Sequence, residues 1–394
     1  MKKAWRKVIG GSLTGWKRRL YQLVLLVVIL GAGGFGVAAS GIVPVAASSG
    51  HLPITAWFLN FSMARSVSTH SMGIPVPELD DPNLVLRGGG HYAIGCAPCH
   101  GNPEIHHPRV AAGLTPHPPY LAPKIQDWEP NELFYIAKHG VKFTGMPAWP
   151  TQQRDDEVWA MVAFLLKFPE LDVPGYQELV GDAVHQTEPT SAENLEPSDA
   201  APSLVTTNCS RCHLADGMGR GSGAFPILSG QNEEYLAATM SAFATRSRHS
   251  GTMETVSAGL NEEEIRELAA YYSRQIPTSR RVSQIGNEED VDASRKRGAE
   301  IAENGIPSAR VPACVDCHGT EEPPVNASYP KLNGQYANYL VLQLELFATD
   351  RRGGTEYGHL MQPIAARLTA EQMRDVATYY QSLQLTPTQA AESE

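Results

Sequence analysis

The chain has 394 residues, of which 42% are hydrophobic and 19% are charged. This composition is ordinary for globular domains and excludes a wholly disordered chain. The net charge is −10, yet the first 19 residues carry seven basic and no acidic side chains, which leaves 25 basic against 42 acidic residues in the rest. A charge balance of this sign argues against non-specific nucleic-acid binding, so we expect no nucleic-acid partner.

An apolar segment follows the basic N-terminus. No charged residue occurs between Arg19 and Arg65. The run from Leu20 to Ala39 would rise about 30 Å as a helix, which is enough to cross a lipid bilayer. We predict that residues 1–47 form an uncleaved anchor in membrane lipid. The basic flank places its N-terminus in the cytoplasm. A secretory signal cleaved at residues 45–47 is the alternative, and it exports the same domains.

Residues 48–81 connect the anchor to the first globular domain. Within them, large apolar side chains recur at roughly helical spacing. This spacing predicts an amphipathic helix, which either lies on the outer membrane surface or packs against the first domain. The sequence leaves both possibilities open. The apolar residues concerned are Ile54, Trp57, Phe58, Phe61 and Val67.

The six cysteines form three identical Cys-x-x-Cys-His motifs, and none is left over. In this motif two thiols bind the two vinyl groups of one porphyrin, and the adjacent histidine reaches the iron from the same face. A zinc site or a thioredoxin-like redox pair also uses Cys-x-x-Cys, but three motifs each followed by histidine favour covalent haem. We predict three haem c groups, bound by Cys96, Cys99, Cys209, Cys212, Cys314 and Cys317, with His100, His213 and His318 as axial ligands.

A methionine follows each motif histidine at a distance of 40–46 residues, and an aromatic residue follows each methionine after 18 more. A neutral thioether together with histidine makes the iron centre of electron-transfer cytochromes. We therefore predict Met146, Met253 and Met361 as the second axial ligands. Met218 is a weaker rival for the second haem because it lies so close to His213. We expect ordinary core packing for Met161, Met240 and Met373.

Each of these methionines precedes an amphipathic helix, which would cover a haem that its own domain cannot otherwise bury. The helices are predicted over residues 155–168, over residues 261–273 and from Thr369 onward. The second opens with an asparagine cap and three glutamates, which suit the positive end of the helix dipole. Their predicted inward faces are Val158, Met161, Val162, Leu165 and Leu166, then Ile265, Leu268 and Tyr272, then Met373, Val376 and Tyr380.

The three segments resemble class I cytochrome c domains. The second and third also resemble each other, because Phe225-Pro-Ile-Leu-Ser-Gly-Gln parallels Tyr329-Pro-Lys-Leu-Asn-Gly-Gln. Over roughly residues 203–385 this pair is similar to the fused two-haem cytochromes c of the c-four type. The resemblance implies that a proline carbonyl, here of Pro226 and Pro330, accepts a hydrogen bond from the ligand histidine.

The first segment, roughly residues 82–180, resembles single-haem class I modules of bacterial respiratory chains. Its Gly-Met-Pro-Ala-Trp sequence at residues 145–149 is similar to their methionine loop. It departs from the other two between Gly101 and Pro123, and we expect Pro119 to supply the carbonyl for its histidine.

We therefore expect an all-α chain with one N-terminal transmembrane helix followed by three class I cytochrome c domains. A polar, proline-containing linker should let the first domain move relative to the other two, while a shorter linker should hold these two close. The expected units are the anchor 1–47, an amphipathic linker 48–81, domain 1 at 82–180, a flexible linker 181–202, domain 2 at 203–280, a linker 281–293, domain 3 at 294–386 and a tail 387–394.

Two groups of polar side chains have less specific interpretations. His106, His107 and His117 lie in one loop of the first domain, where we expect solvated side chains rather than a metal site. Four arginines precede the methionines of domains 2 and 3. They are candidates to pair with haem propionates, since arginine suits carboxylates, or else they are ordinary surface charges. These are Arg246, Arg248, Arg351 and Arg352.

The expected function is single-electron transfer by a membrane-bound triheme cytochrome c, with its haem domains on the periplasmic side of a bacterial inner membrane. An iron with both axial ligands has no open position, so we expect an electron carrier without a small-molecule substrate at haem. The alternatives are a cytochrome subunit of a membrane dehydrogenase or of a terminal oxidase complex, and a haem enzyme such as a peroxidase. The partners should be redox proteins, at least one of which docks through a basic patch.

Overall fold

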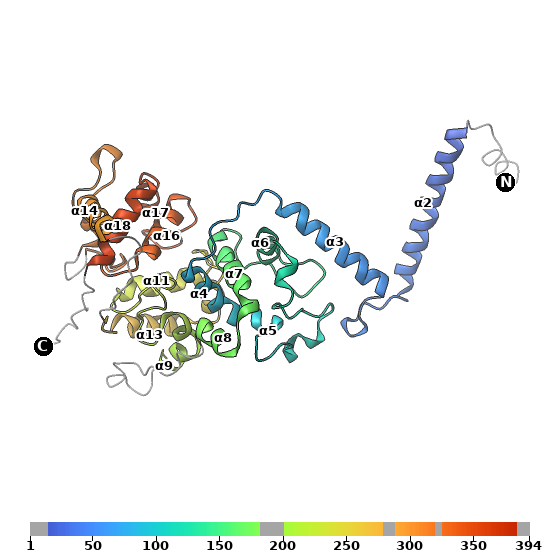
Figure 1. The fold of residues 1–394 in the computed structure, drawn as a ribbon, viewed down its shortest axis with the longest axis horizontal. Coiled ribbons are helices and arrows are strands. Elements are labelled where there is room, and N and C mark those ends of the chain that lie inside the picture. Colours follow the sequence, from blue (N-terminus) through green and yellow to red (C-terminus); the bar gives the residue numbers. More distant parts are fainter. Residues whose placement is uncertain (1–14, 182–200, 279–287, 320–324, 384–394) are drawn as a thin grey trace.

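The computed structural model describes residues 15–181, 201–278, 288–319 and 325–383. The basic stub before residue 15, most of the two expected linkers and the expected tail lie outside these residues. The described part is helical and contains no strand, apart from an isolated antiparallel bridge between Ile306 and Val311. The expected all-α fold is confirmed, and Figure 1 shows a long N-terminal helix standing away from the haem domains.

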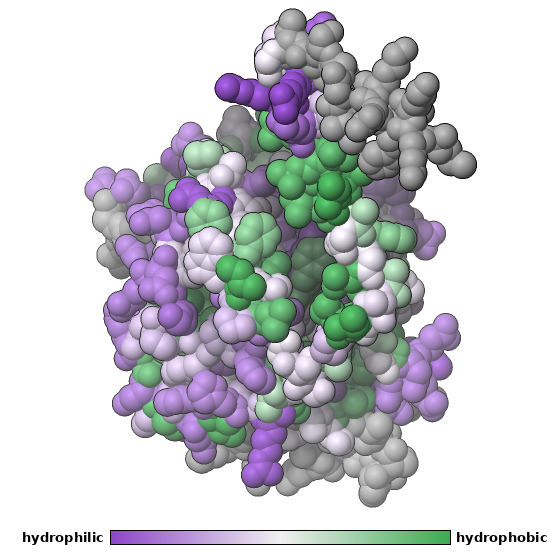
Figure 2. Space-filling model, turned by 90° about the vertical axis from the view of Figure 1, so that its right-hand side faces the viewer, coloured by the Kyte–Doolittle hydropathy of each residue, from purple (hydrophilic) through white to green (hydrophobic). Residues whose placement is uncertain are grey.

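The N-terminal helix α2 (Gly15–Ser40) has no buried residue. Within the described residues, it is the one helix long and apolar enough to cross a membrane, a test that a signal sequence also passes. Figure 2 views the molecule from this side and shows hydrophobic side chains gathered on the face turned to the viewer. Helix α2 is the apolar helix that the sequence predicts.

Helix α3 (Pro53–Ser71) joins α2 to the first haem domain. Near its C-terminal end it packs on α6 (Pro130–His139), where Asn131 Nδ2 donates to the Ser71 carbonyl at 3.0 Å. Val67 is buried there. Toward its N-terminal end, Trp57, Phe58 and Phe61 each remain more than half exposed. Packing against the first domain therefore accounts for only the C-terminal part of α3.

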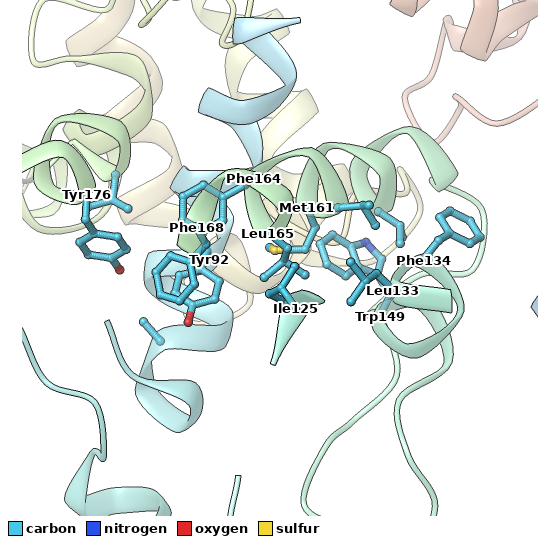
Figure 3. Close-up of a cluster of buried hydrophobic side chains, with 14 residues drawn as sticks. Tyr92, Ile125, Leu133, Phe134, Trp149, Met161, Phe164, Leu165, Phe168 and Tyr176 are labelled. Carbon is cyan, nitrogen blue, oxygen red and sulfur yellow. The ribbon is translucent and has the colours of Figure 1, made fainter. Parts of the chain in front are cut away.

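The first haem domain is built around α4 (Pro82–His91) and α7 (Asp155–Lys167), which cross closely. A Cβ atom on Gly88 would lie 2.1 Å from the Ala160 carbonyl oxygen, so only glycine permits this crossing. The rings of Tyr92, Phe164 and Phe168 pack with centroids 4.9–5.6 Å apart beside the crossing (Figure 3). This aromatic cluster holds α4 in place immediately before the first cysteine motif.

The remaining helices of the domains vary in length. In the first domain they are α5 (Ala97–His100) and α8 (Val173–Val180), in the second α9 (Ala201–Leu204), α10 (Ser210–His213), α11 (Glu233–Ala244), α12 (Met253–Ser257) and α13 (Glu262–Ser273), and in the third α14 (Glu288–Asn304), α15 (Val315–His318), α16 (Ala337–Ala348), α17 (Gly358–Ala365) and α18 (Ala370–Ser382). Single turns of 3₁₀-helix cover Ala47–Ser49, Arg109–Gly113, Ile125–Asp127, Phe168–Glu170 and Pro307–Ala309, and π-helical turns cover Tyr92–Cys96 and Val205–Cys209.

The three predicted helices after the methionines are present as α7, α13 and α18. Asn261 and Thr369 cap the last two, each within a reciprocal capping box. Their predicted inward residues are buried except Leu166, which is 37% exposed, so that prediction was wrong. Helix α14 begins at Glu288, inside the expected linker 281–293. The C-terminal part of the expected linker is therefore helical, and that part of the prediction was wrong.

Domains 1 and 2 are joined by buried polar contacts, which the linker predicted between them did not indicate. The Glu157 carboxylate accepts hydrogen bonds from Ser250 Oγ and from the Gly251 amide, both at 2.6 Å. Arg154 donates to the His249 carbonyl at 2.9 Å and pairs with Glu157 at 3.1 Å. Linker composition could not reveal this contact, because it depends on surfaces that lie outside the linker.

A second set of contacts joins the same two domains at the C-terminus of α8. Arg211 donates to the Val180 carbonyl at 3.2 Å, and Arg220 donates to the Leu179 carbonyl at 3.2 Å. Carbonyl groups at a helix C-terminus lack partners within the helix and carry partial negative charge. The two arginines of domain 2 therefore cap a helix of domain 1.

We predict that Glu157→Ala lowers the free energy of unfolding by about 3 kcal/mol, because it leaves Ser250 Oγ and the Gly251 amide without their acceptor. Urea unfolding of the haem-loaded protein measures this loss. Glu170→Ala is the matched control, since Glu170 pairs with Lys167 at the exposed surface and should cost less than about 0.5 kcal/mol. Equal losses in the two variants would contradict the domain contact.

Candidate haem sites

Each motif histidine is the last residue of a short helix and makes the same hydrogen bond. Its Nδ1 atom lies within hydrogen-bond distance of a proline carbonyl, which can only accept, so Nδ1 carries the proton. The other nitrogen, Nε2, then keeps its lone pair for a metal. The pairs are His100 with Pro119 at 2.9 Å, His213 with Pro226 at 3.2 Å and His318 with Pro330 at 2.9 Å.

These three bonds confirm the proline partners expected from the sequence, including Pro119. Burial lowers the pKa of all three histidines, that of His213 to about 4, and the bond to proline only partly opposes this. The imidazoles are therefore neutral at physiological pH. In the described part of the chain, no protein atom forms a hydrogen bond with their Nε2 atoms. This is the protonation state that an iron ligand needs.

The cysteines lie in the same short segments as these histidines, and none of the six is paired in a disulfide. Five are half-buried and Cys317 is exposed. Among the described residues, no cluster of three or more His, Cys, Asp or Glu side chains could hold a metal ion. His106, His107 and His117 are exposed.

The three candidate methionine ligands occupy different local structures. Met146 lies in a loop, where its amide donates to Thr144 Oγ1 at 3.1 Å. Met253 is the first residue of α12, and Met361 lies within α17. All three side chains are half-buried.

Four other methionines are buried within the domains or pack against their hydrophobic clusters. Met218, the rival for the second haem, is 1% exposed and packs with Ile227 and Tyr336 between domains 2 and 3. Met161 and Met373 are buried, and Met240 packs against the core of domain 2. This burial favours core packing for these four side chains.

Two of the four candidate arginines lie in the interface between domains 2 and 3. The Arg248 and Arg352 guanidinium groups lie over the rings of Phe243 and Phe347, at 4.6 and 4.4 Å. Arg352 also donates to the Tyr235 hydroxyl at 3.0 Å. Burial alone would raise the pKa of Tyr235, but Arg352 and Arg248 lower it to about 8.

No carboxylate pairs with Arg248 or Arg352 in the regions that the structure describes. Arg248 is 6% exposed, and a buried cation is costly without an anion nearby. The propionates of a haem would supply such anions, so the residues present fit the group. Arg246 and Arg351 are exposed, which fits ordinary surface charge.

Sequence reasoning missed the residues that bring the methionine segments of domains 1 and 2 together. The Trp149 ring packs on His91 with centroids 4.3 Å apart, and His91 Nδ1 is bonded to Thr252 Oγ1 at 3.0 Å. Thr252 immediately precedes Met253. A Cβ atom on Gly90 would lie only 3.2 Å from Cys212 Sγ. The glycine run at residues 88–90 is the sequence signal that could have indicated this close approach.

Two family models match the chain. The model of cytochrome c oxidase, cbb3-type, subunit III, matches residues 83–165 and 197–271. The cytochrome c model matches residues 296–384. Together the matched segments include all three cysteine motifs.

Individual proteins are similar to about half of the chain. The thiosulfate dehydrogenase electron acceptor of Thiomonas intermedia is 31% identical, covering 49% of this chain and 86% of that protein. Cytochrome c4 of Pseudomonas aeruginosa is 30% identical, covering 47% and 88%. A solved cytochrome c4 from Acidithiobacillus ferrooxidans is 33% identical and covers 45% of this chain and 99% of that one, with a TM-score of 0.39.

The chain is therefore an electron-transfer protein that carries haem c. It belongs to the c-type cytochromes and resembles the two-haem c4 type, with a further cytochrome c domain beside that pair. The expected family, cofactor class and electron-carrier function are confirmed.

Proposed function

We propose that this cytochrome is a membrane-bound triheme relay, which passes single electrons along three haems at the periplasmic face of a bacterial inner membrane. The observation that carries the proposal is the threefold recurrence of one local geometry. Each Cys-x-x-Cys-His motif presents a neutral histidine whose Nδ1 atom is held by a proline carbonyl. Haem bound there supplies reversible one-electron chemistry of iron.

The proposed sites keep the expected division of the chain into haem domains at residues 82–180, 203–280 and 294–386. In each, two cysteines anchor the porphyrin and a histidine and a methionine bind the iron. The proposed axial pairs are His100 with Met146, His213 with Met253, and His318 with Met361. Haem held by both residues of a pair would leave no open position for a small substrate, which suits one-electron transfer.

The middle domain contacts both of the others, which supports a relay rather than three independent centres. Domain 1 reaches it through His91 and Trp149, beside Met253. Domain 3 reaches it through Tyr336, whose hydroxyl donates to the Met218 carbonyl at 3.0 Å. The second haem is therefore proposed as the central one of the three.

We expect three haems per mature chain, measured as the ratio of haem to protein. Replacing Cys209 and Cys212 by alanine should reduce the ratio to two, because each domain has its own hydrophobic core. In this variant, electrons placed on one outer haem by flash reduction should reach the other much more slowly. A ratio of two in the wild-type protein, or unchanged transfer without the middle haem, would contradict the relay.

We expect Met253→Leu to open the second iron to cyanide or carbon monoxide and to lower its potential, because methionine ligation raises it. Spectroscopic ligand titration measures this. Met218→Leu is the matched control, since Met218 is buried between the domains and should leave all three irons closed. An iron opened by Met218→Leu would overturn the assignment, and ready ligand binding by the wild-type protein would overturn the pure carrier function.

The membrane attachment is proposed to use two segments. Helix α2 spans the bilayer with the N-terminus in the cytoplasm, and the N-terminal part of α3 lies in the outer interface. The exposed Trp57, Phe58 and Phe61 side chains support the second contact, because aromatic residues favour the membrane–water boundary. The short connection between α2 and α3 keeps this helix near the bilayer.

Deleting residues 20–45 behind a cleavable signal should release a soluble haem protein into the periplasm, since no residue of α2 is buried. The released protein should still bind lipid vesicles weakly. Phe58→Glu should reduce that binding about tenfold, as expected from loss of apolar contact. Leu166→Glu is the control, being an exposed apolar residue on another helix. Equal effects would contradict the role of α3.

A second candidate function is that of a cytochrome subunit in a larger oxidoreductase complex. The match to a cbb3-type oxidase subunit favours delivery to a terminal oxidase, while the relative that accepts electrons from thiosulfate dehydrogenase favours a dehydrogenase partner. Copurification from solubilised membranes distinguishes the two. A freely diffusing partner should dock through basic residues, and its association rate should fall with salt.

A further inference from the structure

Domains 2 and 3 exchange glutamine side chains across their interface. The Gln335 carboxamide bonds both backbone groups of Ile227: the Ile227 amide donates to Oε1 at 3.0 Å, and Nε2 donates to the Ile227 carbonyl at 2.9 Å. Gln231 makes the same two bonds to Lys331, at 2.8 and 2.9 Å. Both glutamines are buried. The interface is thus locally two-fold symmetric.

The donors around each glutamine determine which way its carboxamide is oriented. Besides the amide of the other domain, Gln335 Oε1 accepts from the Tyr336 amide at 3.1 Å, and Gln231 Oε1 accepts from the Asn232 amide at 2.9 Å. An NH₂ group in that position would face two donors, which excludes the flipped arrangement. Tyr336 and Asn232 are also the N-caps of α16 and α11, so each oxygen lies where a helix favours negative charge.

The backbone N–H groups that donate to the two glutamines belong to the same peptide units whose carbonyls bond the iron-ligand histidines. The peptide joining Pro226 to Ile227 accepts from His213 through its carbonyl and donates to Gln335 through its N–H. The peptide joining Pro330 to Lys331 accepts from His318 and donates to Gln231. A peptide unit is conjugated, so donation at nitrogen increases the negative charge on its carbonyl oxygen.

We propose that Gln335 and Gln231 are positioning residues that tune the iron of the opposite domain: Gln335 acts on the second haem and Gln231 on the third. A more negative proline carbonyl binds the histidine Nδ1–H more strongly and makes the imidazole a better donor to iron. This stabilises the oxidised iron and lowers the reduction potential. The inference rests on the proposed histidine ligands and adds a link between domain docking and potential.

Domain 1 provides an internal comparison. Its histidine is held by the Pro119 carbonyl, but the amide of the following residue, Tyr120, has no hydrogen-bond acceptor among the residues described. The first haem therefore lacks this clamp. Changes to either glutamine should leave its potential unaffected.

Gln335→Met tests the proposal, because methionine keeps the length of the side chain and loses both bonds. Stepwise reduction followed by NMR of each haem should show a higher potential for the second haem. The electron equilibrium between the second and third haems should shift about two- to five-fold toward the second, in line with loss of one cooperative hydrogen bond. Gln231→Met should shift the same equilibrium toward the third haem.

An effect of each variant on the haem of the opposite domain distinguishes tuning from a general loss of structure. A change confined to the haem of the mutated domain, or equal changes at all three haems, would overturn the proposal. Gln335→Asn retains a polar amide but shortens its reach, and should act in the same direction if Gln335→Met fails to fold. The Nδ1–H resonance of His213 should also shift in either variant, and an unchanged resonance would contradict the mechanism.

Failure of this inference is distinguishable from failure of the proposed function. Haem content and resistance to cyanide, measured in the same samples, report whether three closed haems are present. If three closed haems are present but each glutamine variant fails to change the potential of the haem in the opposite domain, the relay stands and the tuning role is wrong. If haem content is two or fewer, the relay itself is wrong.

Discussion

The hydrogen bond from histidine Nδ1 to a proline carbonyl is the interaction on which each haem site depends. It fixes the tautomer, directs the free Nε2 lone pair toward the iron position and ties the ring to a backbone segment outside its own motif. In domains 2 and 3 that segment leads within a few residues to the glutamine that enters the other domain. The same short segment thus connects iron ligation to domain association.

The two domain interfaces achieve contact by different physical means. Domains 2 and 3 meet through matched side chains from repeated sequences, with glutamines and arginines in equivalent positions on both sides. Domains 1 and 2 meet through unlike groups, with the Glu157 carboxylate and the α8 carbonyls facing backbone amides and arginines. The first interface pairs equivalent residues of two similar sequences, whereas the second requires two different surfaces to fit.

The sequence allowed prediction of features formed by neighbouring residues, but not of contacts that form only when the domains associate. The cysteine motifs, the cap at Asn261 and the helix start at Thr369 were predictable because each involves residues close in sequence. The proline partners were implied by the resemblance to class I cytochromes c. The contacts of Glu157 and His91 were not, since neither residue has a distinctive neighbourhood until domain 2 is placed against it. Leu166 was assigned to the core because helical periodicity does not show where a covering surface ends.

The middle domain is consequently the one whose environment is set from both sides. On one side, Thr252, next to the proposed ligand Met253, is held by His91 of domain 1. On the other, the peptide that holds His213 is clamped by Gln335 of domain 3. The two proposed axial ligands of one iron are thus supported by different neighbours. A displacement of either outer domain would therefore alter the central iron through a distinct ligand, which makes the middle haem the point where events at the two ends of the chain combine.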